Sequence, residues 1–326
     1  MKVLVTGATG FTGKRLTEIL LQKGYDVRVI IRDKSRFKIP KNSNLEIVIG
    51  DLKNITDVDI AVKDVQIIFH VAALYRTAGA APQEYWDTHV KATENLLNSA
   101  HRNSVKKFIH TSTVGIHSHI ENPPADENYQ IKPGDIYQLT KWEGEKKAKE
   151  FHDKTGLPLV IIRPSAIYGP GDMRLLKLFK IASKKYSIIL GSGEIFYHMV
   201  YVDDLANGLI LAAESNITNG EAFIIGGDGY ISLNKMLDLI SRILNKESKI
   251  IHLPAAPVQI LGSVCEKICI PLGIDPPIYR RRVDFFIKSR AFDISKAKKI
   301  LGYSPKVSLE EGLKRTAEWY KEKAML

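Results

Sequence analysis

Cysteine is scarce in this sequence, which contains Cys265 and Cys269 and no others among its 326 residues. A structural zinc ion needs four protein ligands and there is no second cysteine pair, so we predict no metal site. The spacing of four between Cys265 and Cys269 places both side chains on one face if the segment is helical. We interpret them as reduced thiols in the core of a cytoplasmic protein.

Long apolar runs, repeats and low-complexity tracts are also missing. The first residues, MKVLVTG, begin a strand-like run at once, so we expect no signal peptide. Residues 255–274 are apolar, but Pro257, Glu266, Lys267 and Pro271 interrupt the run of about 20 apolar residues that a spanning helix needs. We expect this segment to pack in the core of a smaller lobe. The alternatives are a lid over a hydrophobic substrate and contact with an anionic membrane surface.

Acidic residues are in deficit, because 47 Lys and Arg stand against 36 Asp and Glu and give a formal net charge of +11. The basic residues are spread along the chain and no nucleic-acid-binding signature is visible, so we predict no nucleic-acid partner. A hydrophobic fraction of 44% and a charged fraction of 25% are typical of a globular protein. The length suits two domains, or one large domain with an added lobe.

Glycine is concentrated near the start, where TGATGFTG follows an apolar, β-branched run at 2–6 and precedes a helical pattern and a second strand at 27–31. Gly7 permits a sharp turn, Gly10 lets the backbone approach a diphosphate, and Gly13 lets the helix pack on the strand. The free N–H groups of the helix then face the anion. We predict a dinucleotide site here, formed by Gly7, Thr9, Gly10, Phe11, Thr12 and Gly13.

The end of the second strand bears on the choice of dinucleotide, since a carboxylate there binds the ribose of NAD and an arginine accepts the extra phosphate of NADP. The chain reads Ile31-Arg32-Asp33. Arg32 favours NADP as the cofactor. NAD stays open through Asp33, and so does a solvated Arg-Asp pair with no role.

Two further strands follow, at 45–52 and 65–73, with helical segments between them. Ligands of such sheets bind at the carboxyl ends of the strands. We therefore expect Asp51 and Leu52 to contact the adenine. The wall of the pocket is then formed by His70, Val71, Ala72 and Ala73 rather than these residues joining the core, and His70 is a packed histidine rather than a catalyst.

A fifth strand, at 106–115, ends in three hydroxyl residues, and a helix at 135–151 carries Tyr137 and Lys141. The spacing of four puts these two side chains on one face of the helix. An ammonium near a tyrosine favours the phenolate and lowers its pKa from about 10. Tyr137 then serves as acid and base, Thr113 bonds the substrate oxygen, and a nicotinamide exchanges the hydride.

Taken together, TGATGFTG, GDL, FHVAA, TST, YQLTK and RPSAIYGPG resemble the extended short-chain dehydrogenase/reductase superfamily, with its NAD-dependent epimerase/dehydratase family. The resemblance implies an α/β fold: a doubly wound, parallel Rossmann sheet over residues 1–165, with a smaller C-terminal α/β substrate lobe at 166–326 that partly interleaves with it. It implies a homodimer formed through two helices per subunit. The site residues that it implies are catalytic Thr113, Tyr137 and Lys141, with Tyr137, Lys141 and Pro164 also at the cofactor.

One position departs from the pattern of the family. The helix before the fifth strand commonly reads Asn-Val-x-Gly-Thr, whereas this chain has His89 in place of the asparagine. His89 either supports the backbone of the active site as the asparagine would, or has no role. This departure affects the details of how protons reach the catalytic residues, and it does not change the class of reaction that we predict.

The choice of substrate depends on the second half of the chain. Nucleotide-sugar epimerases typically carry Arg-Asp-Phe before the segment that matches VYVDDLA, and this chain has Tyr197-His198-Met199 there. Cations that could replace that arginine are Arg280, Arg281, Arg282 and Arg290.

The VRVIIRD and FHVAA strands are more similar to the dihydroflavonol-reductase and 3β-hydroxysteroid-dehydrogenase branch. We therefore predict an NAD(P)-dependent oxidoreductase for an alcohol or ketone in a largely apolar small molecule. The alternatives are a nucleotide-sugar epimerase or dehydratase with tightly bound NAD, and a dinucleotide-sensing protein without catalysis.

Overall fold

The computed structural model describes residues 1–77, 79–269, 272 and 280–326. Its larger sheet has seven parallel strands in the order β10-β6-β5-β4-β1-β2-β3. The order reverses next to β1, as in doubly wound folds. The strands are β1 (Lys2–Thr6), β2 (Asp26–Ile31), β3 (Leu45–Ile49), β4 (Ile67–His70), β5 (Lys107–Thr111), β6 (Leu159–Pro164) and β10 (Asn219–Ile225).

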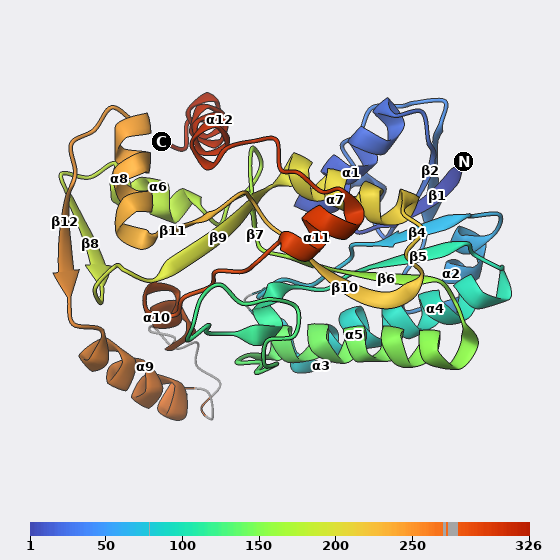
Figure 1. The fold of residues 1–326 in the computed structure, drawn as a ribbon, viewed down its shortest axis with the longest axis horizontal. Coiled ribbons are helices and arrows are strands. Elements are labelled where there is room, and N and C mark those ends of the chain that lie inside the picture. The colour runs from blue at the N-terminus through green and yellow to red at the C-terminus, as the bar shows by residue number, and fades with distance from the viewer. Residues whose placement is uncertain (78, 270–271, 273–279) are drawn as a thin grey trace.

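Helices cover both faces of this sheet (Figure 1). Because side chains alternate along a strand, Val3 and Val5 of β1 join the core under α1 and α7, while Leu4 joins the opposite core under α2 and α4. The buried strands are continuously apolar for this reason. The helices around the sheet are α1 (Phe11–Gln22), α2 (Ile55–Val62), α3 (Pro82–Trp86), α4 (Ala92–Arg102), α5 (Ile136–Thr155), α7 (Val202–Glu214) and α11 (Ser295–Leu301).

A second lobe packs around its own core, to which Phe179, Leu237 and Tyr320 contribute. It contains a three-stranded sheet, β11-β9-β7, and a two-stranded sheet, β12-β8. Its strands are β7 (Ala166–Tyr168), β8 (Tyr186–Leu190), β9 (Phe196–Tyr201), β11 (Tyr230–Ser232) and β12 (Lys249–Leu253). Its helices are α6 (Leu176–Ala182), α8 (Leu233–Ile243), α9 (Ala255–Cys269), α10 (Arg280–Ile287) and α12 (Leu309–Glu322).

The α/β architecture with a parallel Rossmann sheet is confirmed. Strand β10 and helix α7 come from beyond residue 165 and complete the larger sheet and one of its covering layers. The division of the chain at residue 165 stays a prediction.

Strand ends differ from the expected ones. The predicted strands at 45–52 and 65–73 stop at Ile49 and His70. In both cases the chain leaves the sheet where it begins to line the cavity described below, so the last residues contact a ligand site rather than another strand.

The apolar segment at 255–274 does not pack in the core as we predicted. Within α9, Gly262 alone is buried, and Ile260 is 66% exposed. Cys265 and Cys269 are half-buried thiols on this helix and not core residues. The reason is that α9 contacts chiefly α10 and has no sheet beneath it, as its peripheral place in Figure 1 shows. Residues 270–271 and 273–274 of the segment lie outside the described residues.

Across the described ranges, no helix combines the length and the apolar character that crossing a membrane requires.

Candidate active site

A cavity of about 900 Å³ runs along the carboxyl ends of the parallel strands and continues to the second lobe. Every residue that the sequence predicted for catalysis or cofactor binding lines it. These residues are Gly7, Thr9, Gly10, Phe11, Thr12, Gly13, Arg32, Asp51, Leu52, Val71, Ala72, Ala73, Thr113, Tyr137, Lys141 and Pro164. Their roles remain predictions.

The glycine turn at one end of the cavity leaves no space for side chains. Gly7 has φ +73°, and a Cβ on it would lie 2.8 Å from Cα of Ala72. A Cβ on Gly13 would lie 2.3 Å from the carbonyl oxygen of Gly7, so helix α1 could not pack so closely on the turn. Gly10 is the N-cap of α1 and supplies no capping side chain, which leaves the first N–H groups for an anion.

The cavity also presents hydroxyl groups without partners. The side-chain oxygens of Thr111, Ser112 and Ser165 are buried, and none has a hydrogen-bond partner in the described part of the chain. All three residues line the cavity. Buried polar groups are normally bonded, so these hydroxyls and the glycine turn together fit a polar ligand such as a dinucleotide.

The end of the cavity beside β2 is cationic. Arg32 and Arg36 line it. Asp33 is turned to the short helix η1 (Lys34–Arg36), where its carboxylate accepts hydrogen bonds from the backbone N–H of Ser35 at 2.8 Å and from its hydroxyl at 2.7 Å. These bonds lower the pKa of Asp33 and occupy its Oδ1.

Thr113, Tyr137 and Lys141 meet in the middle of the cavity. Thr113 follows β5, where its hydroxyl accepts from the N–H of Gly115 at 3.0 Å and also hydrogen-bonds Tyr137. Tyr137 and Lys141 lie one turn apart in α5, and the Lys141 ammonium donates to the carbonyl of Thr111. The three side chains therefore come from two elements that are adjacent only in the folded chain.

The electrostatics of this group differ from our prediction. Burial raises the pKa of Tyr137, and the groups that most oppose this are the guanidinium of Arg76, the hydrogen bond from Thr113 and the guanidinium of Arg174. We expected the Lys141 ammonium to lower this pKa. Lys141 instead points to the Thr111 carbonyl, and burial lowers its own pKa to about 8.

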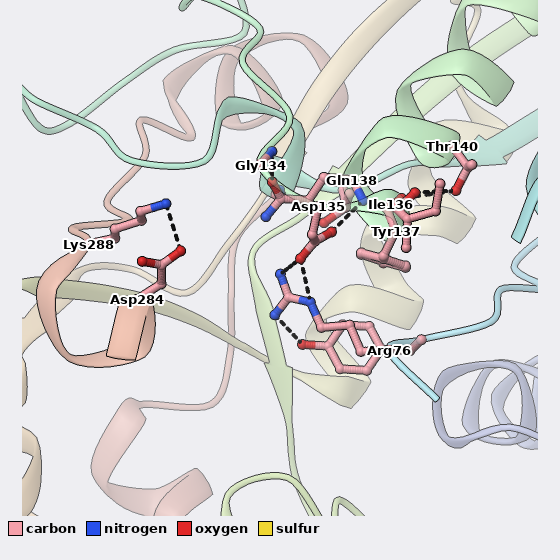
Figure 2. A network of polar contacts seen from close by, with 12 residues as sticks. Arg76, Gly134, Asp135, Ile136, Tyr137, Gln138, Thr140, Asp284 and Lys288 are labelled. Carbon is pink, nitrogen blue, oxygen red and sulfur yellow. Dashed lines mark hydrogen bonds and ion pairs between the residues drawn. The ribbon is translucent and has the colours of Figure 1, made fainter. Parts of the chain in front are cut away.

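Arg76 stands beside Tyr137 in an unusual conformation. Its φ is +38°, a value that non-glycine residues rarely adopt and that clusters at functional sites. Its guanidinium nitrogens Nη2 and Nε bind the carboxylate of Asp135 at 2.7 and 3.0 Å. The guanidinium carbon, Cζ, lies 5.8 Å from the centre of the Tyr137 ring. Figure 2 shows Asp135 between Arg76 and the first turn of α5, where it caps the N–H of Gln138 at 2.8 Å. One carboxylate thus fixes both the helix start and the arginine.

His89 supports the backbone of the site, as one of our two interpretations expected. Its Nε2 accepts from the N–H of Leu74 at 3.0 Å, and its Nδ1 lies 2.7 Å from the hydroxyl of Thr140 in α5. The contact with Leu74 assigns the proton to Nδ1. Burial lowers the pKa of His89 to about 2, so the ring is neutral.

His70 is a packed histidine, as predicted, but it lies in the core and does not line the cavity, where we also placed it. It is 1% exposed, and its two ring nitrogens lie 2.9 Å from the hydroxyls of Thr6 and Thr93.

Among the cavity residues that sequence reasoning missed are Tyr75, Arg76 and Arg174. Arg76 could have been predicted from the sequence, because it lies six residues beyond the last residue of strand β4, at the edge of the sheet where ligands bind. Arg174 lies in an irregular segment between β7 and α6, and no pattern in the sequence places it beside Tyr75.

A glycine turn at a helix start, a parallel doubly wound sheet and a Thr-Tyr-Lys group at its carboxyl edge together define the extended short-chain dehydrogenase/reductase class. The model of the NAD dependent epimerase/dehydratase family matches residues 3–226. The chain therefore belongs to this family.

Individual relatives cover nearly the whole chain. The chain is 30% identical to 3beta-hydroxysteroid-dehydrogenase/decarboxylase isoform 1 of Arabidopsis thaliana, over 97% of this chain and 78% of that protein. It is 29% identical to UDP-glucuronate 4-epimerase of Thermodesulfobacterium geofontis, over 98% of this chain and 96% of that protein. The solved structure of UDP-glucuronic acid 4-epimerase from Bacillus cereus in complex with NAD matches 99% of both chains with a TM-score of 0.80 and 28% identity.

These findings confirm the predicted superfamily and the likeness to hydroxysteroid dehydrogenases. The chain is an enzyme of a family whose members include NAD-dependent dehydrogenases, epimerases and dehydratases.

Proposed function

We propose that this enzyme prefers NADP(H) and transfers hydride between the nicotinamide and an alcohol or ketone of a largely apolar small molecule. The observation that supports this most directly is the meeting of Thr113, Tyr137 and Lys141 in the same cavity as the glycine turn. Such a cavity brings an acid/base to a dinucleotide site.

Each residue of the site has a separate role in the proposed reaction. Thr113 holds the substrate oxygen beside the Tyr137 hydroxyl, and Tyr137 exchanges a proton with that oxygen. Arg76 lies over the tyrosine ring and stabilises its anionic form, while Lys141 holds the end of β5 and binds the ribose. When bound, the nicotinamide supplies or accepts the hydride. Glycine residues 7, 10 and 13 and the helix start hold the diphosphate.

NADP rather than NAD is supported by the charges beside β2. Arg32 and Arg36 are both available to a 2′-phosphate, whereas the carboxylate of Asp33 is engaged by Ser35. Two guanidinium groups would bind a phosphate strongly, whereas Asp33 offers a ribose only the carboxylate oxygen that Ser35 does not bond.

A nucleotide-sugar epimerase with retained NAD is the second candidate, favoured by the likeness to UDP-glucuronate epimerases. Against it, Tyr197 stands where those enzymes typically carry the arginine, and this tyrosine is buried and donates its hydroxyl hydrogen to the carbonyl of Phe285. Of the four arginines that we considered as replacements, Arg290 lines the cavity and keeps this candidate open. The side chains of Arg280, Arg281 and Arg282 lie outside what the structure describes. The third candidate, a dinucleotide sensor without turnover, has no need of an acid/base group.

The first experiment is to unfold the freshly purified protein and to identify by mass any dinucleotide that it releases. An empty protein that then binds NADPH more tightly than NADH supports the proposal, and stoichiometric NAD favours the epimerase. Tyr137→Phe should then abolish turnover of an oxidised or reduced substrate and leave NADPH affinity within about twofold. The exposed Tyr186→Phe on β8 is the matched control, and retained turnover in Tyr137→Phe contradicts the mechanism.

We also propose a homodimer and a cytoplasmic location. The dimer rests on the family resemblance, and the location rests on the two cysteines, which we interpret as reduced thiols. Sedimentation at several concentrations and cell fractionation test them.

A further inference from the structure

The part of the cavity beyond Tyr137 is strongly basic. Arg76, Arg174 and Arg290 all line it. They come from three separate segments: the loop after β4, the segment before α6 and the residues after α10.

Two of these arginines are neutralised by the protein itself. Arg76 pairs with Asp135 at 2.7 Å, and Arg174 pairs with Asp172 at 2.6 Å (Figure 2 shows the first pair). Each carboxylate offsets most of the charge of its arginine, while guanidinium N–H groups that it does not bond can still donate to a ligand. They fix the two guanidinium groups in place.

Arg290 is not neutralised. Its guanidinium has no ion pair or hydrogen bond with any side chain that the structure describes. The carboxylate whose charge it senses belongs to Asp284, which is already paired with Lys288 at 2.8 Å, as Figure 2 shows. Its own backbone is fixed, since its N–H donates to Phe196 at 2.8 Å and its carbonyl accepts from His198 at 2.9 Å.

An arginine in this position carries its charge at every physiological pH, because a guanidinium is not deprotonated in proteins. Burial and the nearby charge of Arg76 lower the pKa of Arg290, which means that the surroundings disfavour the cation. Arg290 is half-buried in the wall of the cavity. A ligand that fills the cavity would bury this charge, which is costly unless an anion pairs with it. No described protein group supplies that anion.

The other walls of this region are apolar. Tyr197 packs on Phe285 with ring centres 5.0 Å apart, and Met199, Met236 and Phe292 also line the cavity. A ligand that fits must therefore present an apolar body to these side chains and an anionic group to the arginine.

We propose that Arg290, aided by Arg76, binds an oxyanion group of the substrate, so that the substrate class is an amphipathic hydroxy or oxo compound bearing one carboxylate or phosphate. The proposal rests on the proposed function, because it places this group in the same cavity as the reacting oxygen at Tyr137. It refines the largely apolar substrate that the sequence suggests. The shared chemistry is an oxyanion with an apolar chain attached.

The test uses three probes with the same apolar chain: octanoate, octyl phosphate and the neutral methyl octanoate. Their affinities are measured by calorimetry on the full-length protein loaded with NADPH. At least one anionic probe should bind about tenfold or more tightly than the ester. Tighter binding of octanoate indicates a carboxylate substrate, and tighter binding of octyl phosphate indicates a phosphate substrate.

The variants separate Arg290 from general charge effects. Arg290→Gln should abolish the preference for the anionic probe, Arg290→Lys should restore part of it, and Arg76→Gln should weaken it. Arg242→Gln removes an exposed arginine of α8 that pairs with Asp238, and it should leave the preference unchanged. Normal NADPH binding in all four variants shows that they fold.

Three results would overturn the inference: no binding of either anionic probe, equal affinity for the ester, or an undiminished preference in Arg290→Gln. Each leaves the proposed function standing as long as NADPH binds. Failure of NADPH binding in the wild-type protein would instead contradict the proposed function.

Discussion

Replacement of Gly13 by alanine tests the cofactor site most directly, because the new Cβ would meet backbone and not a flexible side chain. It would lie 2.3 Å from the carbonyl oxygen of Gly7 and 2.6 Å from its carbon. Real Cβ atoms stay more than 3.0 Å from such atoms, so helix α1 and the turn must separate by roughly 1 Å.

The expected cost has two parts. Overpacking of this kind costs about 3 kcal/mol of folding free energy, since neither element can yield without losing its contacts with the sheet. The separation also moves the N–H groups of the helix start away from the diphosphate, and we expect the affinity for NADPH to fall by about tenfold or more.

The assay combines urea unfolding, followed by circular dichroism, with NADPH titration followed by fluorescence. Gly229→Ala is the matched control, because a Cβ at Gly229 has no heavy atom within 4 Å. It should change stability by less than about 0.5 kcal/mol and leave NADPH affinity unaltered. If Gly13→Ala behaves like this control, the glycine turn does not hold the dinucleotide as we infer.

Three further predictions concern burial. Glu145→Gln breaks the pair with Arg163, in which both side chains are buried and 2.5 Å apart, and should cost about 3 kcal/mol in urea unfolding; a loss below about 0.5 kcal/mol would contradict the buried-pair argument. Ile260→Ser on α9 should change stability by less than about 0.5 kcal/mol, because this side chain is 66% exposed, and a large loss would show that α9 is covered. Lys141→Met should stabilise the protein at pH 7 by up to about 3 kcal/mol, with the advantage shrinking as pH rises from 8 to 10. The sign follows from the pKa of Lys141, which burial lowers to about 8 in the folded protein, whereas the ordinary value is about 10.4. Between these two pH values the unfolded chain binds more protons than the folded protein. The stability of the wild-type protein therefore rises with pH in this range. An advantage that grows with pH, measured by unfolding at several pH values, would refute this reasoning.

The dinucleotide half of the site could be predicted from sequence because its determinants are local. Strand, glycine turn and helix are consecutive from Lys2 to Gln22, and each glycine is required by contacts within that short segment or with the neighbouring strand end. Tyr137 and Lys141 were also found locally, through their shared helix face. Our prediction that segment 255–274 packs in the core was wrong. An apolar sequence indicates which residues can be buried, but burial also requires another helix or strand to pack against them.

The sequence by itself determined the class of fold, the glycine turn proposed for the dinucleotide and the three residues proposed for catalysis, since these depend on periodicity, turn chemistry and spacing along short stretches. The tertiary structure alone decided which charges surround Tyr137. Arg76, Arg174 and Arg290 are separated by about a hundred residues from one another, and only the packing of the second lobe against the sheet brings them to one cavity. Electrostatic interactions depend on distance in space and on burial, and neither can be read from the order of residues in the chain.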